Sequence, residues 1–203
     1  GPAPHLAAAT HGAQRLARMK THPSTTMTTP HLITIPSPAV APSAARDFDF
    51  LRGPWRIRNT RLVRRLAGCN DWEVFDATGS VHPLPAGIGN YDSFTPQAWK
   101  PGYVGMALRV FSPESQRWSI YWLDNLTGGL DPATGLLLPP VVGGFQDGVG
   151  LFEGGDLFEG RPVRVRFEWS QMHTGAPRWQ QAFSDDGGAT WEVNWVMEFA
   201  RPV

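Results

Sequence analysis

Apolar residues recur at every second position in several short segments of the chain after Asp47. In one of these segments Val163, Val165, Phe167 and Trp169 alternate with polar or charged residues. A segment whose two faces differ in this way is typical of a half-buried strand in an antiparallel sheet. The pattern therefore predicts a β-rich domain.

Turn sequences separate these segments. Asp147-Gly148 between apolar flanks is typical of a two-residue hairpin turn, because glycine adopts a positive φ without steric cost. No run of ten or more residues has a strong helical period, and the only helical turn that we expect lies around residues 43–51. About ten strands are predicted, near residues 55–66, 72–80, 86–93, 103–111, 117–123, 141–146, 149–155, 161–171, 177–184 and 190–200. An all-β meander of this length closes into a barrel or folds into a sandwich.

Composition divides the chain at residue 46. Residues 1–46 contain no Asp, Glu, Phe, Trp or Tyr, whereas residues 47–203 hold all nine Trp and all 18 acidic residues. A segment without aromatic residues and rich in Pro buries too little apolar surface to offset its ordering entropy. We expect 1–46 to be an irregular arm, flexible or docked, and 47–203 to be the folded domain. The first two residues, Gly1-Pro2, are typical of a tag remnant.

Charge and cysteine content exclude several classes of function. Lys and Arg total 18, as do Asp and Glu, and this zero net charge argues against binding nucleic acid through a basic surface. The single Cys69 excludes an internal disulfide and a four-cysteine zinc site. No segment approaches the ~20 apolar residues of a membrane-spanning helix. We expect a cytoplasmic protein with no membrane partner, and a homodimer is left open.

The two ends of the domain favour a barrel over a sandwich. Gly53-Pro54-Trp55 opens the first strand, and Arg201 follows the last one. This arrangement resembles the calycin superfamily, the lipocalins and fatty-acid-binding proteins, in which a Gly-x-Trp closes the barrel base and a terminal Arg stacks on the Trp. With residues 48–51, 118–122 and 181–195, the pattern resembles a bacterial calycin-like family of unassigned function. The resemblance covers 47–203 and implies an antiparallel barrel of about ten strands, with a short helix at its start and no known reaction.

Residues 184–191 match the Asp-box pattern S-x-D-x-G-x-T-W that sialidases repeat. A propeller enzyme needs the box in every blade of a much longer chain, and here it occurs once. Its Ser and Asp side chains satisfy turn amides, and its Gly takes a positive φ. The motif therefore predicts a structural hairpin.

The late strands supply the candidate binding residues. As core, their indoles would fill a small barrel; as a cavity wall, they would form a rigid aromatic surface for a flat apolar ligand. Arg164 and Arg166 share a face that is usually solvated, but if it pointed inward it could hold a carboxylate, as fatty-acid-binding barrels do. The candidate ligand-binding residues are Trp118, Trp122, Arg164, Arg166, Trp169, Trp179, Trp191, Asn194 and Trp195.

Binding of a small hydrophobic or aromatic molecule inside a Trp-lined barrel is the function that the sequence favours. The alternative is a cofactor-independent isomerase, lyase or cyclase that holds a natural-product-like substrate in the same cavity, with Glu168, Asp124, Tyr121 or His82 as acid and base. A third interpretation is an interaction domain with a filled barrel. We expect no metal and no cofactor, because the domain contains only His82 and His173 as histidines.

Overall fold

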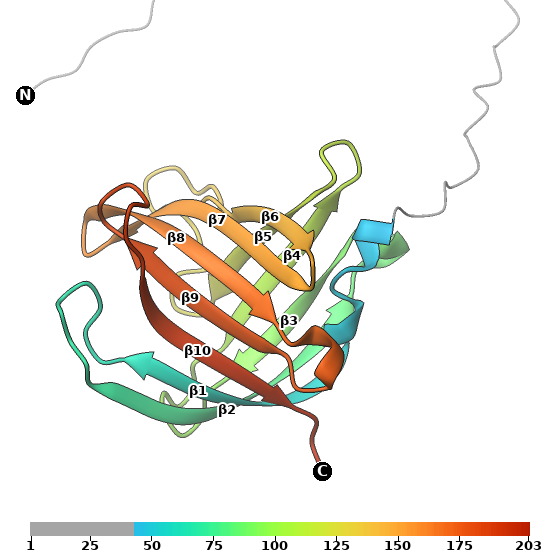
Figure 1. The fold of residues 1–203 in the computed structure, drawn as a ribbon, viewed down its shortest axis with the longest axis horizontal. Helices are drawn as coiled ribbons and strands as arrows, with labels where there is room; N and C mark the ends of the chain where they lie inside the picture. The colour runs from blue at the N-terminus through green and yellow to red at the C-terminus, as the bar shows by residue number, and fades with distance from the viewer. Residues whose placement is uncertain (1–42) are drawn as a thin grey trace, which may run out of the picture. The chain divides into compact units, whose positions relative to one another are not determined.

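The computed structural model describes residues 43–203, and these form one closed antiparallel barrel (Figure 1). Each strand pairs with its neighbours in the chain, and β1 pairs with β10 to close the ring. This confirms the predicted all-β barrel of ten strands with a short helix at its start. Residues 1–42, most of the predicted arm, lie outside the described residues. The strands are β1 (Gly53–Leu62), β2 (Trp72–Pro83), β3 (Gly89–Thr95), β4 (Gly105–Ser112), β5 (Arg117–Asp124), β6 (Val141–Gln146), β7 (Val149–Phe158), β8 (Arg161–Ser170), β9 (Arg178–Ser184) and β10 (Glu192–Ala200).

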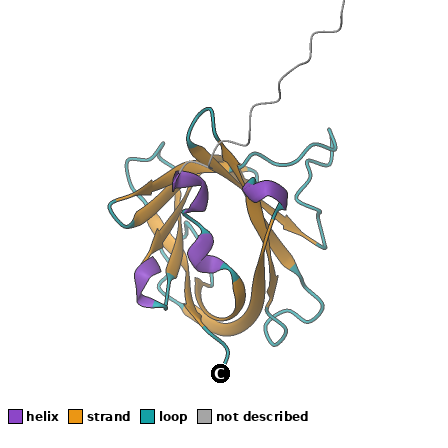
Figure 2. Cartoon of the chain, turned by 90° about the vertical axis from the view of Figure 1, so that its right-hand side faces the viewer, coloured by secondary structure: helices purple, strands orange, loops and turns teal. Residues whose placement is uncertain are grey.

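Four short 3-10 helices accompany the strands. They are η1 (Ser43–Arg46), η2 (Asp49–Leu51), η3 (Pro85–Gly87) and η4 (Met172–Thr174). Figure 2 views the ring of strands from the end where these helices gather. Phe48, between η1 and η2, is almost fully buried, and its ring contacts the rings of Trp118, Phe145, Phe152 and Trp169. Phe48 therefore plugs this end of the barrel.

The period of two in the sequence sets which side chains fill the interior. In β8, Val163, Val165, Phe167 and Trp169 face the inside of the barrel, while Arg164, Arg166 and Glu168 between them face outward. A bulge between Val193 and Trp195 in β10 interrupts this alternation once. Residues that are paired in neighbouring strands point to the same side of the sheet. The inward side chains of all ten strands therefore pack into one hydrophobic core that is rich in aromatic residues.

At one place in the barrel, two neighbouring strands are paired over only a short length. β5 and β6 share three register pairs, from Trp118–Gly143 to Ile120–Val141. The end of β5 and residues 154–158 of β7 therefore have no partner in β6, and the loop 125–140 passes beside them. Trp122, Gly155 and Asp156, which lie next to this break in the ladder, are exposed.

Candidate functional site

The barrel encloses a cavity of about 230 Å³. A water molecule occupies about 30 Å³ in the liquid, and a cavity of about 150 Å³ suffices for benzene. The space is therefore large enough for one or two fused rings, but below the range of about 300–1,000 Å³ that drug-sized ligands use. A filled barrel would leave no such space.

Aromatic side chains form a large part of the cavity wall. Trp122, Trp169, Trp179 and Trp195 all line it, together with Phe94 and Phe167. β8, β9 and β10 each contribute one of the tryptophans from an inward position. The sequence predicted these four tryptophans as ligand-binding residues, and the structure brings them together around one space.

The wall is held rigidly by contacts among its own rings. Trp179 meets Phe167 and Trp195 edge to face, with ring centroids 4.9 and 6.1 Å apart. The indole nitrogen of Trp195 donates to Oδ1 of Asn59 at 3.0 Å, and Asn59 is fully buried. A wall fixed in this way loses little conformational entropy when a flat ligand packs against it.

The cavity reaches the surface beside the short β5–β6 pairing. Its rim consists of Trp122, Leu138, Pro139, Gly155 and Asp156, all of which are exposed. These residues come from the end of β5, the loop 125–140 and the unpaired end of β7. These rim residues are distinct from the aromatic residues that Phe48 contacts at the plugged end.

A polar cluster interrupts the apolar lining. Nη2 of Arg109 lies 2.5 Å from Oδ2 of Asp92, and Nη1 donates to Oδ1 of Asn90 at 2.9 Å. Arg109 and Asp92 both line the cavity. Sequence reasoning missed this pair, although Arg109 lies between Ala107 and Phe111 in the apolar alternation of β4, which is a signal that it points inward.

A second polar cluster lies next to Trp195. The guanidinium of Arg61 lies 5.3 Å from the ring centroids of both Trp99 and Trp195, and it pairs with Glu73 at 2.9 Å. Nε1 of Trp99 donates to the other oxygen of Glu73 at 3.0 Å. Neither Arg61 nor Glu73 lines the cavity. Arg61 contacts the lining residue Trp195, and Glu73 holds Arg61 in place.

Two predicted binding residues are buried away from the cavity. Trp118 lies on the inward face of β5 but at the plugged end, where its Nε1 donates to the carbonyl oxygen of Ala44 at 3.0 Å. Asn194 occupies the bulge of β10, is fully buried and accepts a hydrogen bond from Gln181. Asn194 therefore positions Gln181, which does line the cavity.

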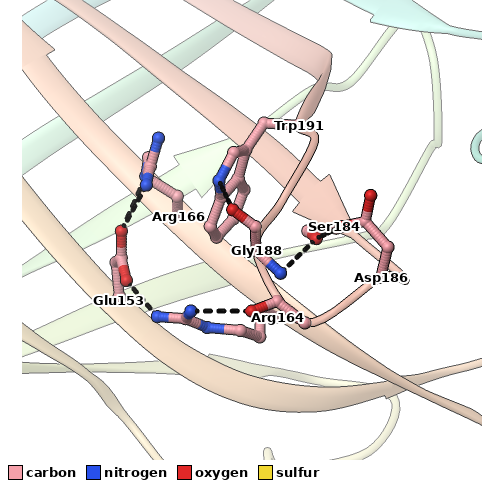
Figure 3. A network of polar contacts seen from close by, with 8 residues as sticks. Glu153, Arg164, Arg166, Ser184, Asp186, Gly188 and Trp191 are labelled. Atoms are coloured by element: carbon pink, nitrogen blue, oxygen red, sulfur yellow. Dashed lines mark hydrogen bonds and ion pairs between the residues drawn. The ribbon is translucent and has the colours of Figure 1, made fainter.

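The other three predicted binding residues lie on the outer surface. Arg164 and Arg166 both pair with Glu153 of β7, and the guanidinium of Arg166 lies 3.9 Å from the ring centroid of Trp191 (Figure 3). The alternation of β8 turns both arginines outward because Val163, Val165 and Phe167 take the inward positions. The expected solvated face is therefore observed, and no arginine of β8 reaches the interior.

None of the four acid–base candidates lies among the residues around the cavity. Glu168 and Tyr121 take outward positions in β8 and β5, and His82 stacks on Tyr91 outside the lining. Asp124 caps the turn that follows β5: burial acts to raise its pKa, but hydrogen bonds from Thr127 and Leu126 lower the pKa on balance. The four groups do not converge on any shared site.

In residues 43–203 no three His, Cys, Asp or Glu side chains come close enough together to hold a metal ion. Over the same residues, no helix has both the length and the apolar character needed to cross a membrane.

Comparison with known proteins does not assign a family. No protein-family model matches the chain, and no curated protein matches it. Among solved structures, the crystal structure of Rv2717c from M. tuberculosis is similar, with 11% sequence identity and a TM-score of 0.45. The match covers 81% of this chain and 100% of Rv2717c. A likeness at this level carries no conclusion about family or function.

Proposed function

We propose that this protein binds a small hydrophobic or aromatic molecule inside its barrel. The observation that carries the proposal is the cavity of about 230 Å³, which has Trp122, Trp169, Trp179 and Trp195 among its lining residues and opens at an exposed rim. Concave, largely apolar pockets with a few polar groups are the usual sites for small molecules. The volume of this cavity favours a ligand of one or two rings over a long lipid chain.

The calycin-like kind of barrel is part of the same proposal. The guanidinium of Arg201 lies 3.6 Å from the ring centroid of Trp55 at the barrel base, as the resemblance to that superfamily implied. Small closed barrels of this type hold one small ligand in the space between their side chains. The contact between Arg201 and Trp55 supports a calycin-like architecture. The cavity supports the binding of a small ligand, as in calycin barrels.

A cofactor-independent isomerase, lyase or cyclase is the less supported alternative. Such an enzyme needs an acid or base within hydrogen-bond reach of its substrate. Glu168, Asp124, Tyr121 and His82 all lie elsewhere, and the carboxylates at the cavity are Asp92, which is paired with Arg109, and Asp156 on the rim. The geometry therefore favours binding over catalysis.

The test is equilibrium dialysis with naphthalene as a flat, uncharged probe. We expect one saturable site per chain, with weakened binding in Trp122→Ala. Removing one ring from the wall exposes roughly 60 Å² of ligand surface, which at about 25 cal/mol per Å² corresponds to about a tenfold loss of affinity. Trp122 is 37% exposed, so its truncation should cost less stability than truncation of the buried Trp169 or Trp179.

Trp72→Ala is the matched control. Trp72 is 42% exposed and does not line the cavity, so its loss should leave naphthalene binding within about twofold of the unmodified protein. Absence of binding to the unmodified protein, together with a first binding site created by Trp195→Ala, would show that the barrel interior is packed full in solution and would overturn the proposal.

A further inference from the structure

The cavity contains one carboxylate that the chain holds in a fixed position. Oδ1 of Asp92 accepts a hydrogen bond from the backbone nitrogen of Ala107 at 2.8 Å, where the β3–β4 register is interrupted. Oδ2 of Asp92 meets Nη2 of Arg109. Arg109 is itself anchored by Asn90, and these two residues are only 5% and 6% exposed. The carboxylate is therefore set in place before any ligand arrives, by two direct contacts from Ala107 and Arg109 and indirectly by Asn90, which holds Arg109.

Stability alone does not account for this pair. Removing two charges from water costs several kcal/mol per ion, and well-packed apolar residues of similar volume are often as stable as a buried ion pair. Arg109 also leaves its Nε buried without a hydrogen-bond partner. A costly buried ion pair on the wall of a largely apolar cavity is better explained by recognition of a polar group on the ligand.

The chemistry of the pair defines that polar group. An ionised carboxylate has about four acceptor sites and no donor, and the protein supplies two donors to Asp92, from Ala107 and Arg109. The Asp92 side chain is 15% exposed and lines the cavity, so acceptor capacity remains toward the ligand. Nε of Arg109 is buried, and Nη1 and Nη2 donate to Asn90 and Asp92, so the polar group with hydrogen-bonding capacity left for a ligand is the Asp92 carboxylate.

Charge around the cavity argues against an ionised ligand. The charged residues of the lining are Asp92, Arg109 and the rim residue Asp156, which leaves one negative charge in excess. A ligand anion would be repelled by both carboxylates, and a ligand cation at Asp92 would lie beside the guanidinium of Arg109. An uncharged donor avoids both costs.

We propose that the ligand of this cavity is an uncharged aromatic compound with a hydroxyl group, which donates a hydrogen bond to the Asp92 carboxylate. This inference rests on the proposed binding function and names the class of ligand that the same site selects. The aromatic body then packs against Trp122, Trp169, Trp179 and Trp195.

Five probes that share one ring system test the inference by equilibrium dialysis at neutral pH. They are naphthalene, 2-naphthol, 2-methoxynaphthalene, 2-naphthoate and the ammonium form of 2-naphthylmethylamine. 2-Naphthol should bind about tenfold more tightly than 2-methoxynaphthalene, which keeps the oxygen but lacks the donor, because hydrogen bonds to charged groups are the stronger ones. Both ionised probes should bind more weakly than naphthalene.

Asp92→Asn should weaken the preference for 2-naphthol over 2-methoxynaphthalene, because a neutral amide oxygen is a weaker acceptor than a carboxylate. It also leaves Arg109 without its counter-ion, so the affinity for 2-naphthoate should rise at least about tenfold. Glu198→Gln is the control: Glu198 is an exposed carboxylate of β10 that does not line the cavity, and its loss should change 2-naphthol binding by less than about twofold.

Should Asp92→Asn fail to fold, the double variant Asp92→Leu with Arg109→Met removes both charges. That variant should bind naphthalene as tightly as the unmodified protein and should no longer distinguish the hydroxyl from the methoxy probe. Equal binding of those two probes by the unmodified protein, or tightest binding of either ionised probe, overturns this inference and leaves the binding function standing. Failure of all five probes to bind overturns both.

Discussion

Arg201 ties the C-terminal end of the barrel to its beginning. Its Nη1 donates to the carbonyl oxygens of Arg52 and Pro54 at 2.8 and 3.1 Å, and its guanidinium stacks on Trp55. Trp55 in turn donates to the carbonyl oxygen of Leu51 at 2.6 Å. Gly53 has a φ of 91°, and a Cβ there would lie 3.3 Å from Nη1 of Arg201. The glycine therefore provides both the backbone conformation and the space that this contact needs.

A double-mutant cycle measures the coupling between these two side chains. Trp55→Ala should lower the free energy of unfolding by about 3–5 kcal/mol as a truncation of a large buried residue. Arg201→Ala should cost about 0.5–2 kcal/mol, and the double variant should cost less than the sum because the stacked pair is lost once. Chemical denaturation measures all four states. Arg56→Ala, at an exposed position of β1, is the control, and additive losses for Trp55 and Arg201 would contradict the stacking.

At the scale of a single element, the hairpin between β9 and β10 explains the Asp-box. Oγ of Ser184 accepts from the backbone nitrogen of Gly188 at 2.8 Å and donates to Asp186 at 2.7 Å. Asp186 also accepts hydrogen bonds from the backbone nitrogen and the hydroxyl of Thr190, at 2.9 and 2.6 Å. Nε1 of Trp191 donates to the carbonyl oxygen of Gly188 at 3.1 Å and completes the turn (Figure 3). The motif is structural here, as the sequence predicted.

This hairpin should make the stability of the protein sensitive to acid. The hydroxyl of Thr190, then its backbone nitrogen and then Ser184, hold the pKa of Asp186 well below its usual range. A carboxyl whose pKa is lowered by folding stabilises the protein above its unfolded pKa of about 3.9, and that contribution is lost as the pH falls toward the folded value. We expect the melting temperature to fall below about pH 4, and to fall less steeply in Asp186→Asn.

Asp185→Asn is the control for this pH titration. Asp185 is adjacent and exposed, and its only ion pair among the described residues is with Arg161 at a long 3.8 Å. The Asp185→Asn substitution should leave the fall in melting temperature below about pH 4 almost unchanged. Parallel pH profiles for the unmodified protein and Asp186→Asn would show that Asp186 does not contribute in this way.

For the molecule as a whole, the described residues place the start of the folded domain slightly before Asp47. Ala44 and Ala45 pack against the core, and Ala44 accepts the hydrogen bond of Trp118. Phe48 and Leu51 are almost fully buried. The plug is thus part of the barrel, whereas residues 1–42 are predicted from their composition to contribute little to folding.

Two truncations separate these parts. Deleting residues 1–42 should leave the melting temperature of the barrel within a few degrees, because that segment has no aromatic residue to bury. Deleting residues 1–48 removes Phe48 as well and should cost at least the roughly 3–5 kcal/mol of a buried Phe truncation. Differential scanning calorimetry compares the two, and a large loss in the shorter deletion would show that the arm is an integral part of the fold.

The sequence by itself determined the strands and the local motifs. Alternation with a period of two in several segments, together with the turn sequences between them, located all ten strands to within a few residues, because backbone pleating places successive side chains on opposite faces. Turn chemistry located the Asp-box hairpin, whose hydrogen bonds span only a few residues. The contact between Trp55 and Arg201 was predicted from the resemblance to calycins, because these residues lie in the first strand and directly after the last strand.

Only the tertiary structure decided which inward residues surround a cavity. Trp118 and Trp122 share one face of β5, yet the first packs against Phe48 and the second lines the space, because the plug fills one end of the barrel alone. Asp92 and Arg109 are 17 residues apart in the chain, and the register of β3 against β4 brings them together. Local periodicity fixes the face on which a side chain lies. The depth at which it lies, and the partner that it meets there, depend on how distant strands are aligned.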